Sequence, residues 1–324
     1  MTNSNTDGSG QMPRRSGRVA PLPWPVVTRL RALAGIVAIS FSAIFVRLAD
    51  VAPTTAALFR ALYAIPILVM VRFFVRDDRP TRARLMSFAA GGLLAVDLIV
   101  WHMSIRLIGP GLATVVANVQ VVWVGLVAWI VFREHPTKTA LAVVPVILIG
   151  ITLIGGLGRE DAFGDRPLAG AALAAVAGAA YAGFLLIFRA SNRTLAPTAG
   201  PLLDATAGTV LGVLLLAPLD SGFSFAFSWP AHGWLIALAL IGQTIGWLLI
   251  ATALPRLAAL ETSVMLLIQP AATIIWARLI FGDRLSTVQL IGVAVVLAGV
   301  LVAGARGTVR ASVTPAPAAT LPDR

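Results

Sequence analysis

The stretch Gly109–Gly155, GPGLATVVANVQVVWVGLVAWIVFREHPTKTALAVVPVILIGITLIG, returns near the end of the chain and decides the fold. It aligns without a gap onto Ala258–Gly304, AALETSVMLLIQPAATIIWARLIFGDRLSTVQLIGVAVVLAGVLVAG, and Gln120 then falls on Gln269. Each copy consists of two apolar segments around a short charged loop. We infer an internal repeat, which constrains how the two parts of the chain are arranged.

The composition indicates an integral membrane protein. Of the 324 residues, 58% are apolar and 12% are charged, whereas a soluble chain of this length needs far more polar surface. The net charge of +11 comes from basic residues spread among the loops, which argues against a nucleic-acid-binding face. Because the chain contains no cysteine, disulfides and thiolate metal sites are excluded.

Ten apolar segments are each long enough to cross a bilayer, which takes about 20 residues. Their continuous apolar character favours helices over a β-barrel, whose strands alternate with a period of two. We therefore predict an all-α membrane protein. The predicted spans are Ala32–Ala49, Thr54–Val75, Met86–Ile105, Gly111–Phe132, Ala140–Leu157, Leu168–Phe188, Thr198–Ala217, Gly233–Leu254, Ala258–Phe281 and Thr287–Gly304.

Basic residues predict the orientation, because Lys and Arg collect on the cytoplasmic side of a membrane protein. With the N-terminus inside, the inner segments hold roughly three times as many basic residues as the outer segments. We expect a multi-pass protein of the cytoplasmic membrane with both termini in the cytoplasm. The tails, residues 1–31 and 305–324, have the composition of disordered segments.

The repeat divides the chain into two halves of five spans, residues 32–157 and 168–304, joined by a charged outer linker at residues 158–167. An odd number of spans reverses the second half relative to the first, so we predict two inverted repeats around a central cavity. Such halves can exchange conformations and open the cavity first to one side of the membrane and then to the other.

Four strongly polar side chains fall near the centres of predicted spans and pair under the repeat. Gln120 corresponds to Gln269, and Asp97 corresponds to Gln243. We predict that these side chains contact a ligand in the central cavity. The alternative for each glutamine is a hydrogen bond that joins two helices.

Two tryptophans accompany the second pair. Trp101 follows Asp97 and Trp247 follows Gln243, each by four residues and hence on the same helical face. We expect two polar and aromatic ledges that face each other across the cavity. The alternative is that the indole rings fill volume or lie at the membrane interface.

Asp97 is the ionisable member of these four polar residues. A carboxylate at the bilayer centre costs about 2.5–3.5 kcal/mol on the insertion scale, and ionisable groups kept there are usually functional. We therefore expect Asp97 to bind a proton or a cationic group of the substrate. The alternative is a structural carboxylate whose hydrogen bonds are satisfied.

Three further charged residues lie closer to the ends of their spans and are candidates for a gate. Arg60 and Asp204 occupy equivalent repeat positions at opposite ends, and Glu261 lies near the inner end of the ninth span. The alternative is that Arg60 and Asp204 anchor their helices at the membrane interfaces.

The endings of the two copies, FREHPTKTALAVVPVILIGITLIGG and FGDRLSTVQLIGVAVVLAGVLVAG, and the Arg-Ala start at Arg60 resemble the EamA family of the drug/metabolite transporter superfamily. In that family each half closes with an acidic loop residue and a glycine-rich span, matched here by Glu134 with Gly150 and by Asp283 with Gly299. The resemblance implies a cavity lined by both halves, peripheral fifth and tenth spans, and export of amino acids, related metabolites or drugs.

The function predicted from these features is secondary transport, with export of a small metabolite by alternating access. A lipid flippase or a channel-like facilitator of the same fold is the alternative. An intramembrane enzyme is disfavoured because the chain lacks HExxH and GxSxG motifs, and it also lacks a Walker A sequence for ATP. The expected partners are a small-molecule substrate, membrane lipids and protons as coupling ions, with no metal or other cofactor.

Overall fold

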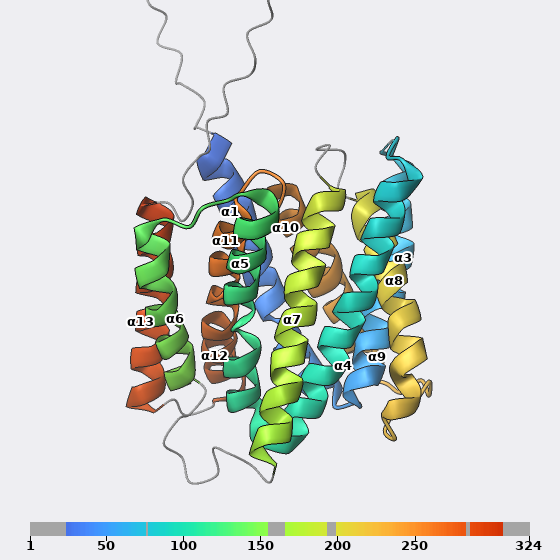
Figure 1. The fold of residues 1–324 in the computed structure, drawn as a ribbon. Helices are drawn as coiled ribbons and strands as arrows, with labels where there is room; N and C mark the ends of the chain where they lie inside the picture. The colour runs from blue at the N-terminus through green and yellow to red at the C-terminus, as the bar shows by residue number, and fades with distance from the viewer. Residues whose placement is uncertain (1–23, 76, 155–165, 193–198, 283–285, 307–324) are drawn as a thin grey trace, which may run out of the picture.

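The computed structural model describes residues 24–75, 77–154, 166–192, 199–282 and 286–306. Every element in these ranges is a helix, and the helices lie side by side in one bundle (Figure 1). In chain order they are α1 (Trp24–Ser40), α2 (Ser42–Ala49), α3 (Pro53–Phe73), α4 (Thr81–Ala117), α5 (Gln120–Phe132), α6 (Lys138–Ile154), α7 (Pro167–Ser191), α8 (Ala199–Leu216), η1 (Ala217–Leu219), α9 (Ala231–Ala237), η2 (Leu238–Gly246), α10 (Trp247–Ala253), α11 (Ala259–Leu266), α12 (Ile268–Phe281) and α13 (Thr287–Arg306).

Within the described residues, seven helical stretches are long and apolar enough to cross a membrane. Three shorter apolar helices overlap further predicted spans: Gln120–Phe132 covers the second part of the fourth, and Lys138–Ile154 and Thr287–Ala303 cover most of the fifth and the tenth. The prediction of an all-helical membrane protein is confirmed. The seven longer stretches are Val26–Ala49, Pro53–Phe73, Thr81–Ser104, Leu168–Ser191, Ala199–Leu219, Ala231–Ala253 and Ala259–Phe281.

The chain between the predicted third and fourth spans is helical. The bounds of these spans leave residues 106–110 as a connecting loop, which is wrong, because α4 continues through them to Ala117. In Figure 1 this helix descends through the bundle and its last turns lie below α5. A helical connection is favourable next to the membrane because its backbone N–H and C=O groups bond to each other.

Two predicted spans are interrupted near their middle. The fourth span is broken between Ala117, where α4 ends, and Gln120, where α5 begins. The ninth span is broken at Leu267, between α11 and α12. These breaks occupy corresponding places in the repeat, since Asn118 aligns with Leu267. Discontinuous helices of this kind free backbone groups near the middle of a membrane protein.

The predicted eighth span contains a π-helix, η2, between α9 and α10. A π-helix is wound more widely than an α-helix, and its backbone hydrogen bonds span five residues. The side chain of Thr244 bonds over the same spacing, because its Oγ1 donates to the carbonyl oxygen of Ala239, five residues earlier, at 2.8 Å. A π-helix is rare and is found mostly as a short insertion at functional sites. This one carries Gln243.

Helix α4 packs closely against α8 because glycines let the two backbones touch. A Cβ atom on Gly91 would lie 1.8 Å from the carbonyl oxygen of Ala205. On the other helix, a Cβ atom on Gly208 would lie 1.9 Å from the carbonyl oxygen of Phe88. Close approach through small residues is a common way for membrane helices to associate.

Helices α6 and α13 pair at one edge of the bundle, at the left in Figure 1. They also meet through glycine, since a Cβ atom on Gly292 would lie 2.6 Å from the carbonyl oxygen of Gly150. This is the peripheral position that the family resemblance implied for the fifth and tenth spans.

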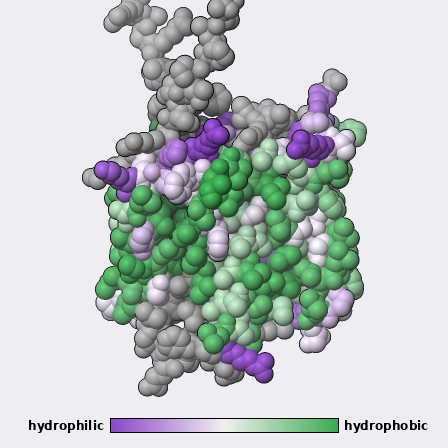
Figure 2. Space-filling view, viewed as in Figure 1, coloured by the Kyte–Doolittle hydropathy of each residue, from purple (hydrophilic) through white to green (hydrophobic). Residues whose placement is uncertain are grey.

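The surface of the bundle is apolar around its middle, and hydrophilic residues gather most densely at its upper end in Figure 2. We call this upper end the basic end. It carries the C-terminal ends of α3 and α7 and the N-terminal ends of α4 and α8 (Figure 1). The other end is called the opposite end.

The glycine contacts predict different outcomes for two neighbouring substitutions on α4. Gly91→Ala forces the α4 and α8 backbones apart, and we expect it to lower the free energy of unfolding by about 1–3 kcal/mol. Gly92→Ala is the matched control, because a Cβ atom there meets nothing within 4 Å. It should leave the stability unchanged or raise it by up to about 1 kcal/mol through helix propensity. Thermal unfolding in detergent measures both, and equal melting temperatures would contradict the packing described.

Candidate functional site

Arg60 brings a guanidinium group into the apolar bundle. It lies on α3, and its Nε donates a hydrogen bond to Oε1 of Gln243 on η2 at 2.8 Å. Gln243 in turn donates through Nε2 to Oγ1 of Thr206 on α8 at 3.2 Å. Asp97 on α4 and Tyr181 on α7 interact electrostatically with the Arg60 guanidinium. Five helices thus contribute to one polar group of residues, which we call the central cluster.

The central cluster keeps hydrogen-bonding capacity for a ligand. Arg60, Asp97 and Tyr181 are half-buried, whereas Gln243 and Thr206 are buried. Within the described part of the chain, Arg60 uses one of its five N–H donors and Asp97 accepts no hydrogen bond. An arginine and a carboxylate placed together can therefore hold an acidic and a basic group of one ligand.

Three predicted residues meet in the central cluster, although they were assigned to different roles. Asp97 and Gln243 were predicted to line the cavity, and the structure brings both to the same guanidinium. Arg60 was predicted as a gate or an interfacial anchor. Its side chain instead reaches inward to Gln243, because the amide oxygen offers an acceptor that apolar neighbours cannot supply.

The predicted pair of facing aromatic ledges is not what the structure shows. Trp247 is 1% exposed, and its ring packs edge-on against those of Phe184 and Phe188 at centroid distances of 4.9 and 6.4 Å. It fills volume in the core, as the alternative held. Trp101 is half-buried beside the ring of His102, at a centroid distance of 5.0 Å. Both indole Nε1 atoms are buried without a hydrogen-bond partner among the described residues.

The two repeated glutamines have different environments. Gln120 is buried, and its Oε1 accepts a hydrogen bond from Oγ of Ser263 at 3.0 Å. This bond joins α5 to α11, as the helix-joining alternative held. Gln269 is half-buried on α12. Neither residue belongs to the central cluster.

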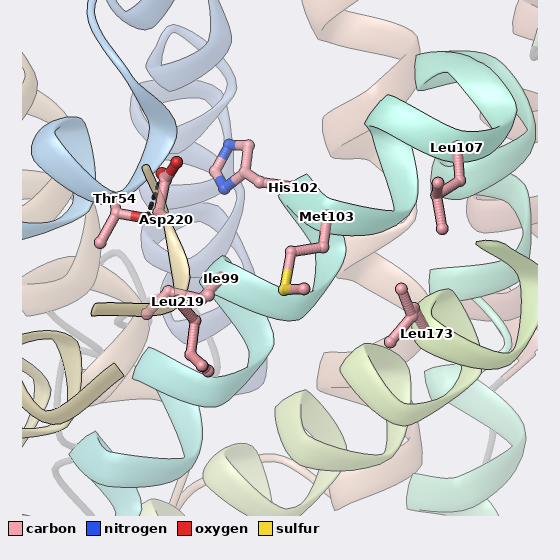
Figure 3. A pocket seen from close by; sticks show the side chains of 8 residues that line it. All are labelled: Thr54, Ile99, His102, Met103, Leu107, Leu173, Leu219 and Asp220. Atoms are coloured by element: carbon pink, nitrogen blue, oxygen red, sulfur yellow. Dashed lines mark hydrogen bonds between the residues drawn. The ribbon is translucent and has the colours of Figure 1, made fainter. Parts of the chain in front are cut away.

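A separate cavity of about 170 Å³ lies towards the opposite end, where α3, α4, α7 and η1 meet. Figure 3 shows Thr54, His102 and Asp220 on one side of it and two leucines on the other. The hydroxyl of Thr54 donates to Oδ2 of Asp220 at 2.6 Å. None of the predicted site residues lines this cavity. The lining residues are Thr54, Ile99, His102, Met103, Leu107, Leu173, Leu219 and Asp220.

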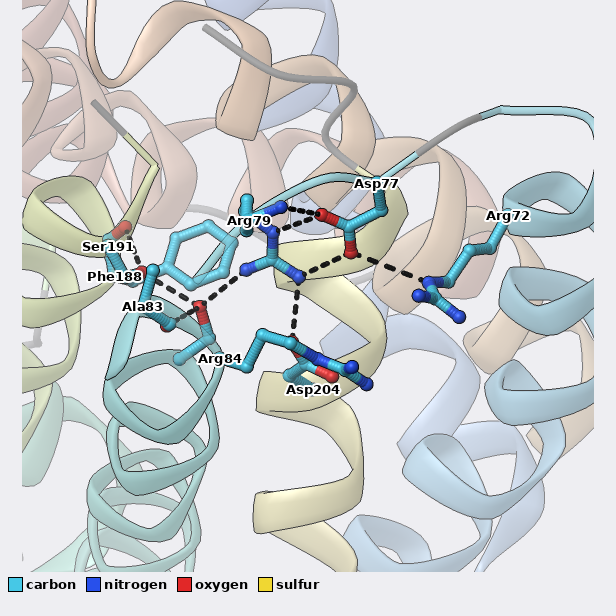
Figure 4. Close-up of polar contacts among 9 residues, drawn as sticks. Arg72, Asp77, Arg79, Ala83, Arg84, Phe188, Ser191 and Asp204 are labelled. Carbon is cyan, nitrogen blue, oxygen red and sulfur yellow. Dashed lines mark hydrogen bonds and ion pairs between the residues drawn. The ribbon is translucent and has the colours of Figure 1, made fainter. Parts of the chain in front are cut away.

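Arg79 organises a buried ion-pair network at the basic end (Figure 4). Its side chain is 1% exposed, and its guanidinium donates to both carboxylate oxygens of Asp77 at 2.8 and 2.9 Å. It also donates to Asp204 on α8 at 2.7 Å and to Ser87 on α4 at 3.2 Å. Ser87 continues the network to Ser191 on α7 at 2.8 Å. The predicted gate candidate Asp204 is thus an ion-pair partner of Arg79.

The Arg79 hydrogen bond sets the charge state of Asp77, which lies in the loop between α3 and α4. That bond lowers the pKa of Asp77 to about 2, and the neighbouring charge of Arg72 acts in the same direction. Asp77 therefore stays ionised over the physiological range. The network packs against Gly200, where a Cβ atom would lie 2.2 Å from Oδ2 of Asp77.

A second ion pair at the basic end joins Glu134, just after α5, to Arg189 on α7 at 2.7 Å. Arg189 also donates to the carbonyl oxygens of Leu254 and Leu257 at 3.1 and 3.0 Å. The second oxygen of Glu134 accepts the backbone N–H of Ala259, at the start of α11, at 2.9 Å. The repeat partner of Glu134, Asp283, lies outside the described residues.

The third predicted gate candidate, Glu261, forms an ion pair as well. Its Oε1 accepts from Nε of Arg29 on α1 at 2.6 Å. Like Arg79–Asp204 and Arg189–Glu134, this pair joins a residue before the predicted linker at 158–167 to a residue after it. Each of these three links lies at the basic end of the bundle.

A family model described as the EamA-like transporter family matches residues 29–156 and again residues 168–305. The chain belongs to the EamA-like transporter family. The resemblance predicted from the sequence is confirmed. A protein of Bacillus subtilis (strain 168) described as the uncharacterized transporter YwfM is 24% identical to this EamA-like chain over 222 residues, which are 68% of this chain and 73% of that protein.

The fold is also found in a solved structure. A crystal structure superimposes with a TM-score of 0.71 at 17% identity, covering 86% of this chain and 96% of that chain. The family and the transporter relative identify this EamA-like chain as a multi-pass membrane transporter. Among the described residues, no three His, Asp or Glu side chains gather in a way that could hold a metal ion.

Sequence reasoning missed several residues that the structure places at these sites. Tyr181 carried a signal, because the chain has two tyrosines and this one lies inside an apolar span. Thr206 carried none, since threonine commonly bonds to its own helix. Arg79 and Arg189 were read as topology signals alone, and their partners became visible only with the packing of distant helices.

Removing the centre of the Arg79 network should destabilise the protein. Arg79→Ala removes the buried cation that Asp77 and Asp204 share, and losing one partner of a buried ion pair typically costs about 3–5 kcal/mol. Arg82→Ala is the matched control, because Arg82 is exposed one turn away. Thermal unfolding in detergent should separate the two variants. Identical melting curves would show that the network does not stabilise the fold.

The lowered pKa of Asp77 predicts a pH dependence with a defined sign. The pKa of Asp77 is lower in the folded protein, about 2, than in the unfolded chain. The ionised carboxylate therefore contributes fully to the free energy of unfolding at pH values above the pKa of the unfolded chain. This contribution is lost as the pH falls through about 2. The stability difference between the natural protein and Asp77→Asn should therefore be constant from about pH 5 to about pH 8. Melting temperatures measured across this range check it, and a difference that disappears within the range would contradict it.

Proposed function

We propose that this EamA-like protein is a secondary transporter that exports a small polar or amphipathic metabolite through the central cluster. The observation that carries the proposal is the convergence of Arg60, Asp97 and Gln243 from three helices inside an apolar bundle. Charged groups are costly at this depth and mark substrate or ion pathways in membrane proteins. A ligand with an acidic group can bind Arg60, and a basic group or a proton can bind Asp97.

The transport mechanism in this proposal is alternating access by two inverted five-span halves. The repeated breaks at Asn118 and Leu267 support it, because each half then contains a discontinuous helix at the same repeat position. The family model also matches the two halves separately, at residues 29–156 and 168–305. The three shorter apolar helices would complete ten spans.

We assign the basic end to the cytoplasm, following the distribution of Lys and Arg. In the structure this end is held by ion pairs between the halves, of which Arg79–Asp204 and Arg189–Glu134 are the most buried. The cavity at Asp220 lies at the other end. These features favour a conformation closed to the cytoplasm, and the inward-open conformation would break these ion pairs.

Asp97 is the coupling residue in this proposal. Its carboxylate interacts electrostatically with Arg60. Protonation of Asp97 would also remove its attraction for a basic group of the substrate, so a proton and the substrate would compete for the site. Exchange of a proton for the substrate at this place would couple export to the proton gradient.

The experiment begins with metabolite profiling of the growth medium when the protein is overproduced, which identifies the exported compound. Asp97→Asn should then abolish export driven by a pH gradient in vesicles. It should preserve membrane insertion and, at saturating substrate concentration, exchange of labelled for unlabelled substrate bound through Arg60, since neither requires proton release. The measurement is uptake into inverted vesicles with and without the gradient.

Asp50→Asn is the matched control for that test. Asp50 is an exposed carboxylate between α2 and α3 with a left-handed backbone, which asparagine also tolerates. The control should transport like the natural protein. Gradient-driven transport by Asp97→Asn at the natural rate would overturn the coupling role.

A further inference from the structure

The segment Ser221–Pro230, SGFSFAFSWP, has an unusual sequence for a connection between two membrane helices. It places an aromatic residue at every second position and contains no charged residue. It joins the stretch that ends at Leu219 to the stretch that begins at Ala231, both of which are long and apolar enough to cross a membrane. We call it the aromatic segment.

Three aromatic side chains of this segment are not covered by the described part of the protein. Phe225 is 64% exposed, Phe227 is 69% exposed and Trp229 is 74% exposed. Exposed aromatic rings in a connection between helices would be costly to leave in water.

The backbone of the aromatic segment is fastened to α3 and α9. The N–H of Ser224 donates to Oγ1 of Thr55 on α3 at 3.0 Å. A hydrogen bond of 3.2 Å joins Nε2 of His232 on α9 to the carbonyl oxygen of Ala226, so this nitrogen carries the proton. The other nitrogen, Nδ1, then accepts from the hydroxyl of Tyr63 at 2.5 Å. The exposed aromatic rings are thus held on a fixed backbone.

We propose that the aromatic segment inserts these rings into the membrane interface at the opposite end, the outer leaflet in the proposed orientation. Two membrane-crossing stretches end on either side of it, which sets its depth at the interface. The apolar surface continues from it onto Leu219 and Leu215, which are also exposed. Tryptophan is enriched at this depth, phenylalanine rings lose their contact with water there, and the absence of charge removes the cost of placing the segment there.

The segment connects the lipid to α3, the helix that carries Arg60 of the central cluster. Thr55, which holds Ser224, lies on α3 five residues before Arg60. At the start of the segment, Asp220 holds Thr54, one residue earlier on α3. Insertion of the rings therefore fixes the end of α3 relative to the membrane surface. The proposal does not depend on what is transported.

The natural absence of cysteine allows a direct test by single-cysteine spin labelling. The variants Phe225→Cys, Phe227→Cys and Trp229→Cys are labelled one at a time in the full chain and reconstituted into phospholipid vesicles. Two reference variants bracket the result. Leu215→Cys reports the lipid-facing surface of α8, and Arg166→Cys reports an exposed charged position just before α7 at the same end.

The measurement is the accessibility of each label to oxygen, which concentrates in the lipid, and to a water-soluble nickel complex. The labels at the three aromatic positions should favour oxygen, as the label at position 215 does, and the label at position 166 should favour nickel. Nickel accessibility at the aromatic positions equal to that at position 166 would overturn the proposal. Spin–spin broadening that depends on the protein-to-lipid ratio would also overturn it, because a second copy would then cover the rings.

A second measurement leaves Phe225 and Phe227 in place. In vesicles of brominated lipid, Trp229→Phe should remove part of the tryptophan quenching that the natural protein shows. Trp247→Phe is the control, because Trp247 is buried in the core and contributes little to quenching by lipid. Equal quenching of the natural protein and Trp229→Phe would contradict insertion of this ring.

Discussion

The guanidinium of Arg60 is the constraint on which the interior depends. A permanent cation in an apolar bundle requires acceptors, and none is available from its own helix once the backbone groups are paired. Gln243 supplies a hydrogen bond from the second half of the chain, and Asp97 supplies a negative charge from the first half. Loss of Asp97 would leave the cation without a counter-charge, and loss of Gln243 would remove its hydrogen bond. The two halves are thus held in register by a hydrogen bond at their centre as well as by packing.

The packing around this cluster is governed by small residues. Gly91 and Gly208 allow α4 and α8 to touch through their backbones, which places Asp97 and Thr206 on neighbouring helices. The π-helix then sets the rotation of Gln243, because its wider winding shifts the side chains that follow relative to an α-helix. The positions of the polar side chains in the central cluster therefore depend on uncharged backbone features, namely the glycine contacts and the π-helix.

The sequence was sufficient to predict an all-helical membrane protein and part of the cluster. Apolar length and the repeat predicted the membrane helices, because burial in lipid imposes the same pattern on every span. Asp97 and Gln243 were found because strongly polar groups at the bilayer centre are rare. The core position of Trp247 and the inward reach of Arg60 could not be predicted, since both depend on which faces of distant helices meet. The π-helix had no sequence signal at all.

The two ends of the bundle are held by different kinds of interaction. At the basic end, Arg79 and Arg189 pair with carboxylates of the other half in places shielded from solvent. At the opposite end, described contacts such as Tyr63 with His232 join the halves through hydrogen bonds. In the alternating-access mechanism proposed above, opening the basic end would separate these charges, so it would require a ligand that binds the inward-open state more tightly. Under that proposal the resting state is closed at the basic end, and ligand binding at the central cluster supplies the free energy that opens it.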